Sequence, residues 1–112
     1  MDSTRQKKIS RLIQKELSEI FQREVREATL GTMVSVTTVR VSPDLGLAKA
    51  YLSIFPGEQK DSVFKAIGEH QVKIRHMLAL RVGKQLRVIP ELHFYIDDSL
   101  DYLENIDRLL KE

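Results

Sequence analysis

The sequence predicts a small α+β domain with the element order helix, strand, strand, helix, strand, helix. Three observations support this order. Apolar residues recur every three or four positions before residue 30, two alternating segments flank a turn in residues 33–55, and a second helical pattern precedes a third strand-like segment. A hairpin is antiparallel, and a helical crossover can bring a third strand into the same sheet. We therefore expect a three-stranded sheet with its helices on one face.

The first helix is predicted from an apolar stripe in residues 9–21. The members of this stripe, spaced to lie along one side of a helix, are Ile9, Leu12, Ile13, Leu17, Ile20 and Phe21. Ser3 or Thr4 is suited to cap the start of the helix, and Gly31 stands just past its expected end.

Residues 33–55 have the pattern of a β-hairpin. The first strand alternates between Val34, Val36, Thr38 on one face and Ser35, Thr37, Val39 on the other, with one face better buried. Pro43, Asp44 and Gly46 supply the fixed φ, the turn-forming side chain and the flexible backbone that a tight turn needs. The returning strand places Ala48, Ala50, Leu52 and Ile54 on one face, and Lys49, Tyr51 and Ser53 on the other.

The second half of the chain predicts a long helix, a strand and a short helix. Residues 60–82 carry the stripe Val63, Ile67, Gln71, Ile74 and Leu78, flanked by Phe64, Met77 and Leu80. Gly68 leaves the continuity of this helix open, and Gly83 is a stop signal. Residues 87–96 predict a third strand, in which Pro90 belongs at an edge, a start or a bulge. Residues 97–112 predict an appended acidic helix, capped within Asp97–Ser99.

Length and composition indicate one domain, spanning residues 1–112. The 112 residues are 42% hydrophobic and 30% charged, as in an ordinary globular protein, and no apolar run approaches the ~20 residues that cross a bilayer. No apolar stretch follows the basic N-terminus as a secretory signal would require, and cysteine is absent. We therefore expect a cytoplasmic protein with no membrane contact.

The net charge of +2 hides an asymmetry along the chain. From Asp97 onward six acidic residues face two basic ones, a net charge of −4, so residues 1–96 carry +6. A basic body with an acidic terminal segment indicates a polyanionic partner, although a chance imbalance on a solvated surface is equally compatible with the charge alone.

The sequence offers no catalytic or metal-binding constellation. His70 and His76 are six residues apart, so they do not share a helix face as a zinc-binding pair would, and His93 stands alone. Asp97 and Asp98 fall where a helix cap is wanted. Neither a nucleophile elbow nor a phosphate-binding glycine loop is present. We expect no enzyme activity, no cofactor, no metal and no small-molecule substrate.

Two groups of cations predict a surface that binds phosphate groups. The first group, on one side of the first helix, is Lys7, Lys8, Arg11 and Lys15; the second, between the second helix and the third strand, is Lys73, Arg75, His76, Arg81, Lys84 and Arg87. Taken singly, each cation could simply solubilise a helix. Of the aromatic side chains, only Tyr51, Tyr95 and Tyr102 are candidates to face solvent, so recognition of RNA shape and backbone is favoured over base-by-base readout.

Several motifs in order resemble the ribosome-binding factor A family. They are the hairpin VSVTTVRVSPDLGLAKAYLS, the opening RQKKISRLIQKELSEIF, Leu30-Gly31, Ile74-Arg75-His76, Gly83-Lys84 with Leu86-Arg87, Pro90-Glu91-Leu92 with Phe94, Asp98-Ser99, and Ile106 with Leu109-Leu110. The resemblance covers nearly the whole chain. Where the family usually has an alanine-x-glycine kink, this chain reads His70-Gln71-Val72-Lys73, so no glycine-loop contact is carried over.

The resemblance implies a type II KH-like fold, α-β-β-α-β, with one helix appended. It implies a non-enzymatic assembly factor that binds the immature 30S subunit and 16S rRNA and assists late maturation, including processing of the rRNA 5′ end, particularly in the cold. We expect a monomer. The alternatives are a general KH-like RNA-binding protein without ribosome specificity, and a protein-interaction module that docks through its acidic closing helix.

Overall fold

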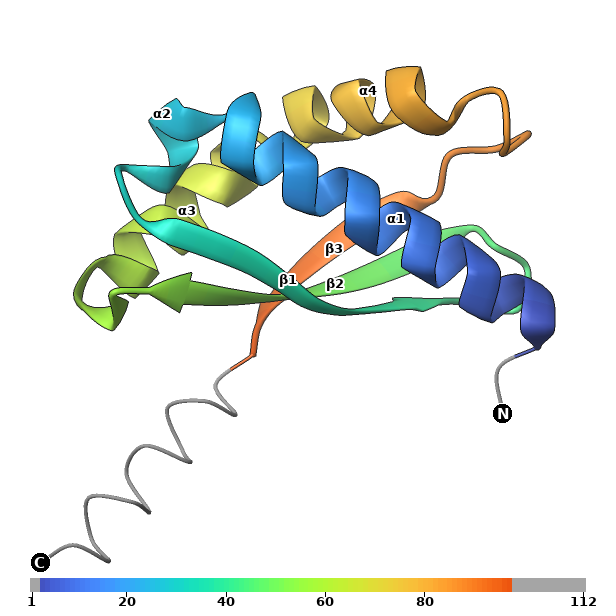
Figure 1. The fold of residues 1–112 in the computed structure, drawn as a ribbon, viewed down its shortest axis with the longest axis horizontal. Helices are drawn as coiled ribbons and strands as arrows, with labels where there is room; N and C mark the ends of the chain where they lie inside the picture. Colours follow the sequence, from blue (N-terminus) through green and yellow to red (C-terminus); the bar gives the residue numbers. More distant parts are fainter. Residues whose placement is uncertain (1–2, 98–112) are drawn as a thin grey trace, which may run out of the picture.

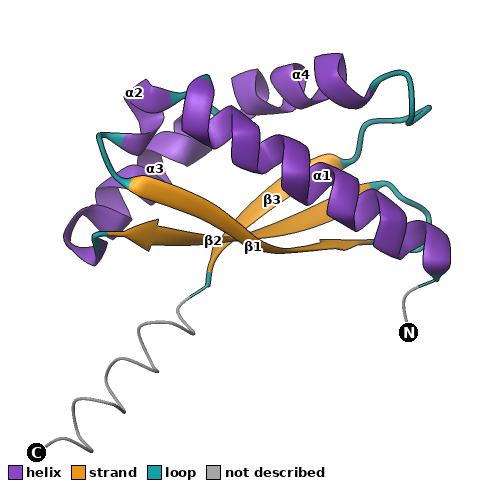
Figure 2. Cartoon of the chain, in the orientation of Figure 1, coloured by secondary structure: helices purple, strands orange, loops and turns teal. Residues whose placement is uncertain are grey.

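The computed structural model describes residues 3–97, which form an α+β domain built on a three-stranded sheet. The strands are β1 (Met33–Val41), β2 (Leu47–Phe55) and β3 (Glu91–Ile96), in the spatial order β1-β2-β3. β1 and β2 are antiparallel, whereas β2 and β3 are parallel. The helices within residues 3–97 lie on one side of this sheet (Figure 1 and Figure 2). The predicted fold class is confirmed, while the predicted closing helix lies outside the described residues.

Helix α1 (Thr4–Arg23) begins at a capping box. Ser3 accepts a hydrogen bond from the Gln6 backbone N–H, and the Gln6 side chain accepts one from the Ser3 backbone. Gln6 Nε2 also donates to the carbonyl of Val41 at 2.9 Å, which ties the start of the helix to the end of β1. The predicted stripe is buried, with Leu12 only partly so.

The region after α1 is more broken than the sequence predicts. The helix ends at Arg23, and a separate turn, α2 (Arg26–Thr29), occupies the stretch before Gly31. Val25 lies between the two helices and is fully buried, so the break serves to bury an apolar side chain. Leu30 and Gly31 then adopt positive φ angles of 52° and 82°, which reverse the chain into β1.

A β-bulge at Thr37 changes which face each β1 side chain occupies. Val36 pairs with Leu52 and Thr38 pairs with Tyr51, so Thr37 is an extra residue. Beyond it Val39 is buried and Thr38 is exposed. The predicted grouping of Thr38 with the buried valines is therefore wrong, because an unbroken alternation was assumed. On β2 the predicted faces are confirmed.

The predicted long helix is two helices, α3 (Lys60–Glu69) and α4 (Gln71–Val82), preceded by the short 3₁₀ helix η1 (Gly57–Gln59). The break is at His70, whose φ and ψ of −97° and 11° are not helical, and not at Gly68. His70 N–H donates to the carbonyls of Ala66 and Ile67, which closes α3. Along both helices the apolar members of the predicted stripe pack into the core, whereas Gln71 is half-buried and Leu80 is 75% exposed.

Strand β3 is shorter than predicted. It begins at Glu91, directly after Pro90, because proline has no N–H to donate to the ladder with β2. Residues 87–90 instead form part of a loop from the end of α4. Leu92 is fully buried, and Phe94 packs edge-to-face on Phe21 of α1 at a centroid distance of 6.0 Å. The core thus lies between the sheet and the helical layer.

Candidate nucleic-acid interface

The first half of α1 carries four exposed cations, here called the α1 cations: Lys7, Lys8, Arg11 and Lys15. They lie opposite the buried stripe of the same helix. Within residues 3–97, none of them forms an ion pair with a carboxylate. These charges are therefore available to an external anion.

A groove of about 240 Å³ separates the α1 cations from the edge strand β1. Lys7 and Arg11 line its helical wall, and the threonines of the β1 bulge line the other. Gln14 spans the gap and donates to the carbonyls of Val36 and Thr37 at 3.0 and 3.2 Å. The Thr37 hydroxyl already donates within the protein, so Lys7, Arg11 and the Thr38 hydroxyl are the groups of this groove that suit a sugar–phosphate backbone.

Arg81 of α4, by contrast, is partly buried and bound by three glutamates. Its Nη1 lies 2.9 Å from Glu16 Oε2 and 2.7 Å from Glu19 Oε2, and its Nη2 lies 2.7 Å from Glu24 Oε1. The hydrogen bonds with Glu24 and then Glu16 raise the pKa of Arg81 above its ordinary value. This geometry gives Arg81 the role of joining α4 to α1.

Lys73 and Arg75 also make contacts within the protein. Lys73 Nζ lies 2.8 Å from Glu27 Oε1 of α2, and this hydrogen bond lowers the pKa of Glu27. Arg75 donates from Nε to the carbonyl of Pro90 and from Nη2 to the carbonyl of Ile89. Arg75 thereby fixes the loop that enters β3.

The other three predicted residues, His76, Lys84 and Arg87, are exposed. Arg87 shares a hollow of about 230 Å³ with Arg5, where the start of α1, the β1–β2 turn and the loop before β3 meet. The structure thus splits the predicted set into cations that are free of ion pairs and cations engaged in internal contacts. Sequence reasoning missed Arg5, although it stands two positions before Lys7 in the same basic start of the helix.

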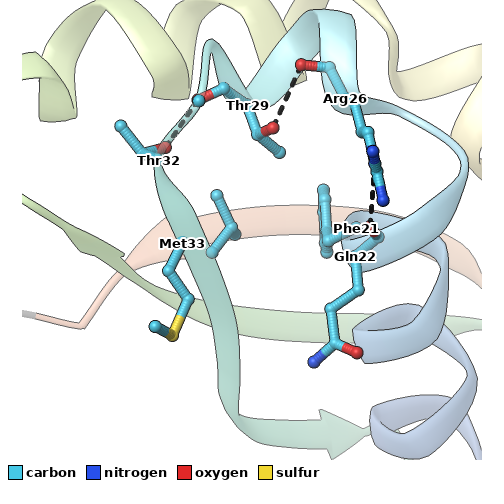
Figure 3. A pocket seen from close by; sticks show the side chains of 8 residues that line it. Phe21, Gln22, Arg26, Thr29, Thr32 and Met33 are labelled. Atoms are coloured by element: carbon cyan, nitrogen blue, oxygen red, sulfur yellow. Dashed lines mark hydrogen bonds between the residues drawn. The ribbon is translucent and has the colours of Figure 1, made fainter.

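A second hollow, of about 420 Å³, lies between the end of α1, α2 and the start of β1 (Figure 3). Phe21 and Met33 give it apolar walls, and Arg26 is the charged residue among its lining side chains. Arg26 donates to the carbonyl of Gln22 at 3.4 Å, and the Thr29 hydroxyl donates to the Arg26 carbonyl. The lining therefore holds no pair of titratable groups suited to proton transfer.

Two features of the described part of the chain bear on other kinds of site. Residues 3–97 contain no group of three or more histidine or carboxylate side chains placed to hold a metal ion. Across the same residues, none of the helices has the length and apolar character needed to span a bilayer.

Comparison with known proteins relates the chain to one family. The family model described as "Ribosome-binding factor A" matches residues 5–110. The ribosome-binding factor A of Christiangramia forsetii is 46% identical over 111 residues, which cover 98% of this chain and 85% of that protein. The predicted family is therefore confirmed at the level of sequence.

Solved structures confirm the KH-like fold. The crystal structure of ribosome-binding factor A from Thermus thermophilus superposes with a TM-score of 0.68 at 22% identity, covering 81% of this chain and 94% of that one. A homology model of the T. thermophilus factor, fitted into a cryo-electron-microscopy map of a complex with the 30S subunit, gives a TM-score of 0.61 at 23% identity. That match covers 78% of this chain and 89% of the other.

Proposed function

This chain belongs to the ribosome-binding factor A family, and we propose on that basis that it binds the 30S subunit through 16S rRNA. The observation that carries the proposal concerns the α1 cations. Within the described residues they form no ion pair with a carboxylate, whereas Lys73 and Arg81 of α4 are paired with glutamates. The T. thermophilus relative in complex with the 30S subunit supports the same partner.

The proposed interface is the α1 cations together with Arg5 and the exposed Lys84, Arg87 and His76. Lys73, Arg75 and Arg81 are engaged in contacts within the protein and are left out of this interface. Each phosphate that such a cation neutralises releases counterions, so binding should weaken with salt by a slope of about 0.7–0.9 in log units per contact. Contacts to backbone position a protein on RNA without reading its sequence, so the folded shape of the rRNA supplies the specificity.

The finer role we propose is that of a non-enzymatic assembly factor in the cytoplasm. By holding a local rRNA conformation in the immature subunit, the protein would assist late maturation, including processing of the 16S 5′ end, most of all in the cold. It would act as a monomer, with no cofactor and no small-molecule substrate. The proposed protein does not hydrolyse a nucleotide, so another factor must release it from the subunit.

Sedimentation of the tagged protein in a sucrose gradient tests the proposal. We expect the protein to migrate with free immature small subunits, to be absent from translating ribosomes and to be released by high salt. The variant Lys8→Glu/Arg11→Glu should lose this co-migration. The matched control Arg23→Glu/Lys65→Glu makes the same change in net charge at exposed positions outside the proposed interface, and should keep it.

The outcomes separate the competing functions. A protein that stays at the top of the gradient in low salt, or that shows no preference for immature small subunits over mature or large ones, contradicts the proposal. Binding to unrelated RNA with the same affinity as to the subunit would favour a general RNA-binding protein. Capture of a protein partner that survives charge reversal on α1 would favour an interaction module.

A further inference from the structure

The face of the sheet opposite the helices is a second polar and aromatic surface, here called the open sheet face. The helices cover the other face (Figure 2), where the alternate side chains of β1 and β2 and Leu92 of β3 are buried, and Phe94 and Ile96 are partly buried. The open sheet face begins with Leu47 and Glu91 and continues with three rows of polar and aromatic side chains and an apolar end: Arg40, Lys49 and His93, then Thr38, Tyr51 and Tyr95, then Ser35 and Ser53, and finally Met33 and Phe55.

A row of basic side chains crosses this face. Arg40 of β1 pairs in register with Lys49 of β2, and Lys49 pairs with His93 of β3. Directly opposed like charges destabilise a sheet, so the fold gains nothing from this arrangement. Among residues 3–97 neither Arg40 nor Lys49 forms an ion pair, while His93 Nε2 lies 3.5 Å from Glu91. Within the described residues Arg40 and Lys49 therefore remain without a carboxylate partner, whereas Glu91 lies beside His93 at the end of the row.

The next row carries two stacked tyrosines. The rings of Tyr51 and Tyr95 have centroids 5.4 Å apart at an interplanar angle of 26°, and Tyr95 is 40% exposed. Beside them a hollow of about 240 Å³ is lined by Arg40, Lys49 and Tyr51. A single-stranded nucleic acid needs both features, because its bases stack on aromatic side chains while nearby cations hold the phosphates.

The register of this face is locked. The hydroxyl of Thr37, the bulge residue, donates to Asp97 Oδ2 at 2.6 Å and also lies 3.2 Å from the Tyr51 carbonyl. These contacts join β1 to β2 and to the residue that follows β3. The bulge turns Arg40 outward, so the cations and the tyrosines are presented on a rigid platform.

We propose that the open sheet face binds single-stranded RNA, with a base stacked on the Tyr51–Tyr95 pair and phosphates held by Arg40 and Lys49. This inference rests on the proposed function and adds to it a contact that reads unpaired nucleotides. Single-stranded RNA is favoured over an acidic protein segment because an acidic segment would use the cations and leave the tyrosines without a partner.

The test uses the full chain and a fluorescent oligoadenylate of about 10 nucleotides, a length within the range of single-strand sites. Tyr51→Ala and Tyr95→Ala should each weaken binding roughly tenfold, the effect of losing one base stack, whereas Tyr95→Phe should bind as the wild type does. Arg40→Gln/Lys49→Gln should reduce the salt slope by about 1.4, the value for two contacts to a single strand. Lys65→Gln, an exposed cation on α3, serves as the control.

Intrinsic fluorescence gives an independent readout. The chain has no tryptophan and three tyrosines, so a Tyr102→Phe background leaves emission from Tyr51 and Tyr95 alone. Stacking of a base should quench this emission at saturating oligoadenylate. A matched duplex of equal charge should not quench it, because its bases are already paired.

The results distinguish this inference from the proposed function. Suppose that Lys8→Glu/Arg11→Glu abolishes subunit binding, while the tyrosine variants bind oligoadenylate and subunits as the wild type does. RNA binding by the open sheet face is then refuted, and the proposed function stands. If the wild type binds no subunit, the proposed function fails. Binding of an acidic peptide with the sequence of residues 98–112 in place of RNA would likewise overturn the inference.

Discussion

Replacing Arg81 with methionine removes a guanidinium from the junction of α1 and α4 but keeps most of its apolar stem. The Arg81 side chain is 23% exposed and contacts Glu16, Glu19 and Glu24, of which Glu16 is only 17% exposed. The variant would leave three neighbouring carboxylates without their cation. We expect a destabilised fold whose remaining RNA-binding surface is unchanged.

The magnitude follows from the exposure of each pair. A charge-assisted hydrogen bond in a partly buried site contributes about 1.5 kcal/mol, which we assign to the Glu16 contact. Pairs with one partner more than a third exposed contribute roughly 0.5 kcal/mol each, which applies to Glu19 and Glu24. The free energy of unfolding should therefore fall by about 2–3 kcal/mol, or roughly 10–20 °C in Tm for a domain of this size.

Urea denaturation followed by circular dichroism measures this loss, with Lys65→Met as a control that removes an exposed cation. A double-mutant cycle with Glu16→Gln isolates the Arg81–Glu16 coupling energy. A loss below about 0.5 kcal/mol would refute the structural role, since the value would be that of an isolated surface pair. Subunit binding, measured well below the Tm of the variant, should equal that of the wild type. Its loss in a folded Arg81→Met protein would instead place Arg81 in the RNA interface.

Three further changes have defined outcomes. Gly83→Ala should lower the free energy of unfolding by about 1–2 kcal/mol in urea denaturation, because the added Cβ would lie 2.7 Å from the Ala79 carbonyl oxygen. Alanine favours helices, so an increase in the free energy of unfolding would show that this contact is relieved and would contradict the prediction. The pKa of Glu27 is below its ordinary value of 4.5, chiefly through the hydrogen bond from Lys73, so this carboxylate stabilises the fold above pH 4.5 and that contribution is lost as the pH falls below it. Melting curves between pH 3 and 6 should show a small acid-side loss that Lys73→Gln abolishes. Leu30→Asn should raise stability by roughly 0.5–1 kcal/mol in thermal melts, since Leu30 is 51% exposed and has a φ of 52°, a conformation that asparagine tolerates better.

The sequence predicted those parts of the fold that depend on local periodicity. The buried stripe through Ile13 and Leu17 and the outward position of Lys49 follow from patterns of 3.6 and 2 residues, and both agree with the structure. The bulge at Thr37 coincides with a three-residue step from Val36 to Val39, but the predicted alternation continued unbroken through it. Arg40 was therefore missed as a partner of Lys49.

The division of the cations could not be predicted from the chain either. Arg81 stands at least 57 residues from each of its three carboxylate partners, so their proximity depends on how α4 packs against α1. In sequence, Arg81 and Arg11 look alike, because each belongs to a group of basic residues on a predicted amphipathic helix. Only the tertiary structure shows that Arg81 is neutralised, whereas Arg11 stays free of ion pairs in the described residues. The family resemblance predicted the fold, which the structure confirms, and an RNA partner, but it did not predict this distinction among the cations.

The bulge at Thr37 links the core of the protein to its open sheet face. Had β1 continued its alternation, Arg40 would point toward the core and Val39 toward solvent, and burying an unpaired guanidinium costs several kcal/mol. The extra residue buries Val39 and places Arg40 opposite Lys49, in the row beside Tyr51. The same irregularity therefore completes the core and creates the cationic row. Because the Thr37 hydroxyl also contacts β2 and the residue after β3, the row and the tyrosines keep a fixed spacing, as a stacked base and its flanking phosphates require.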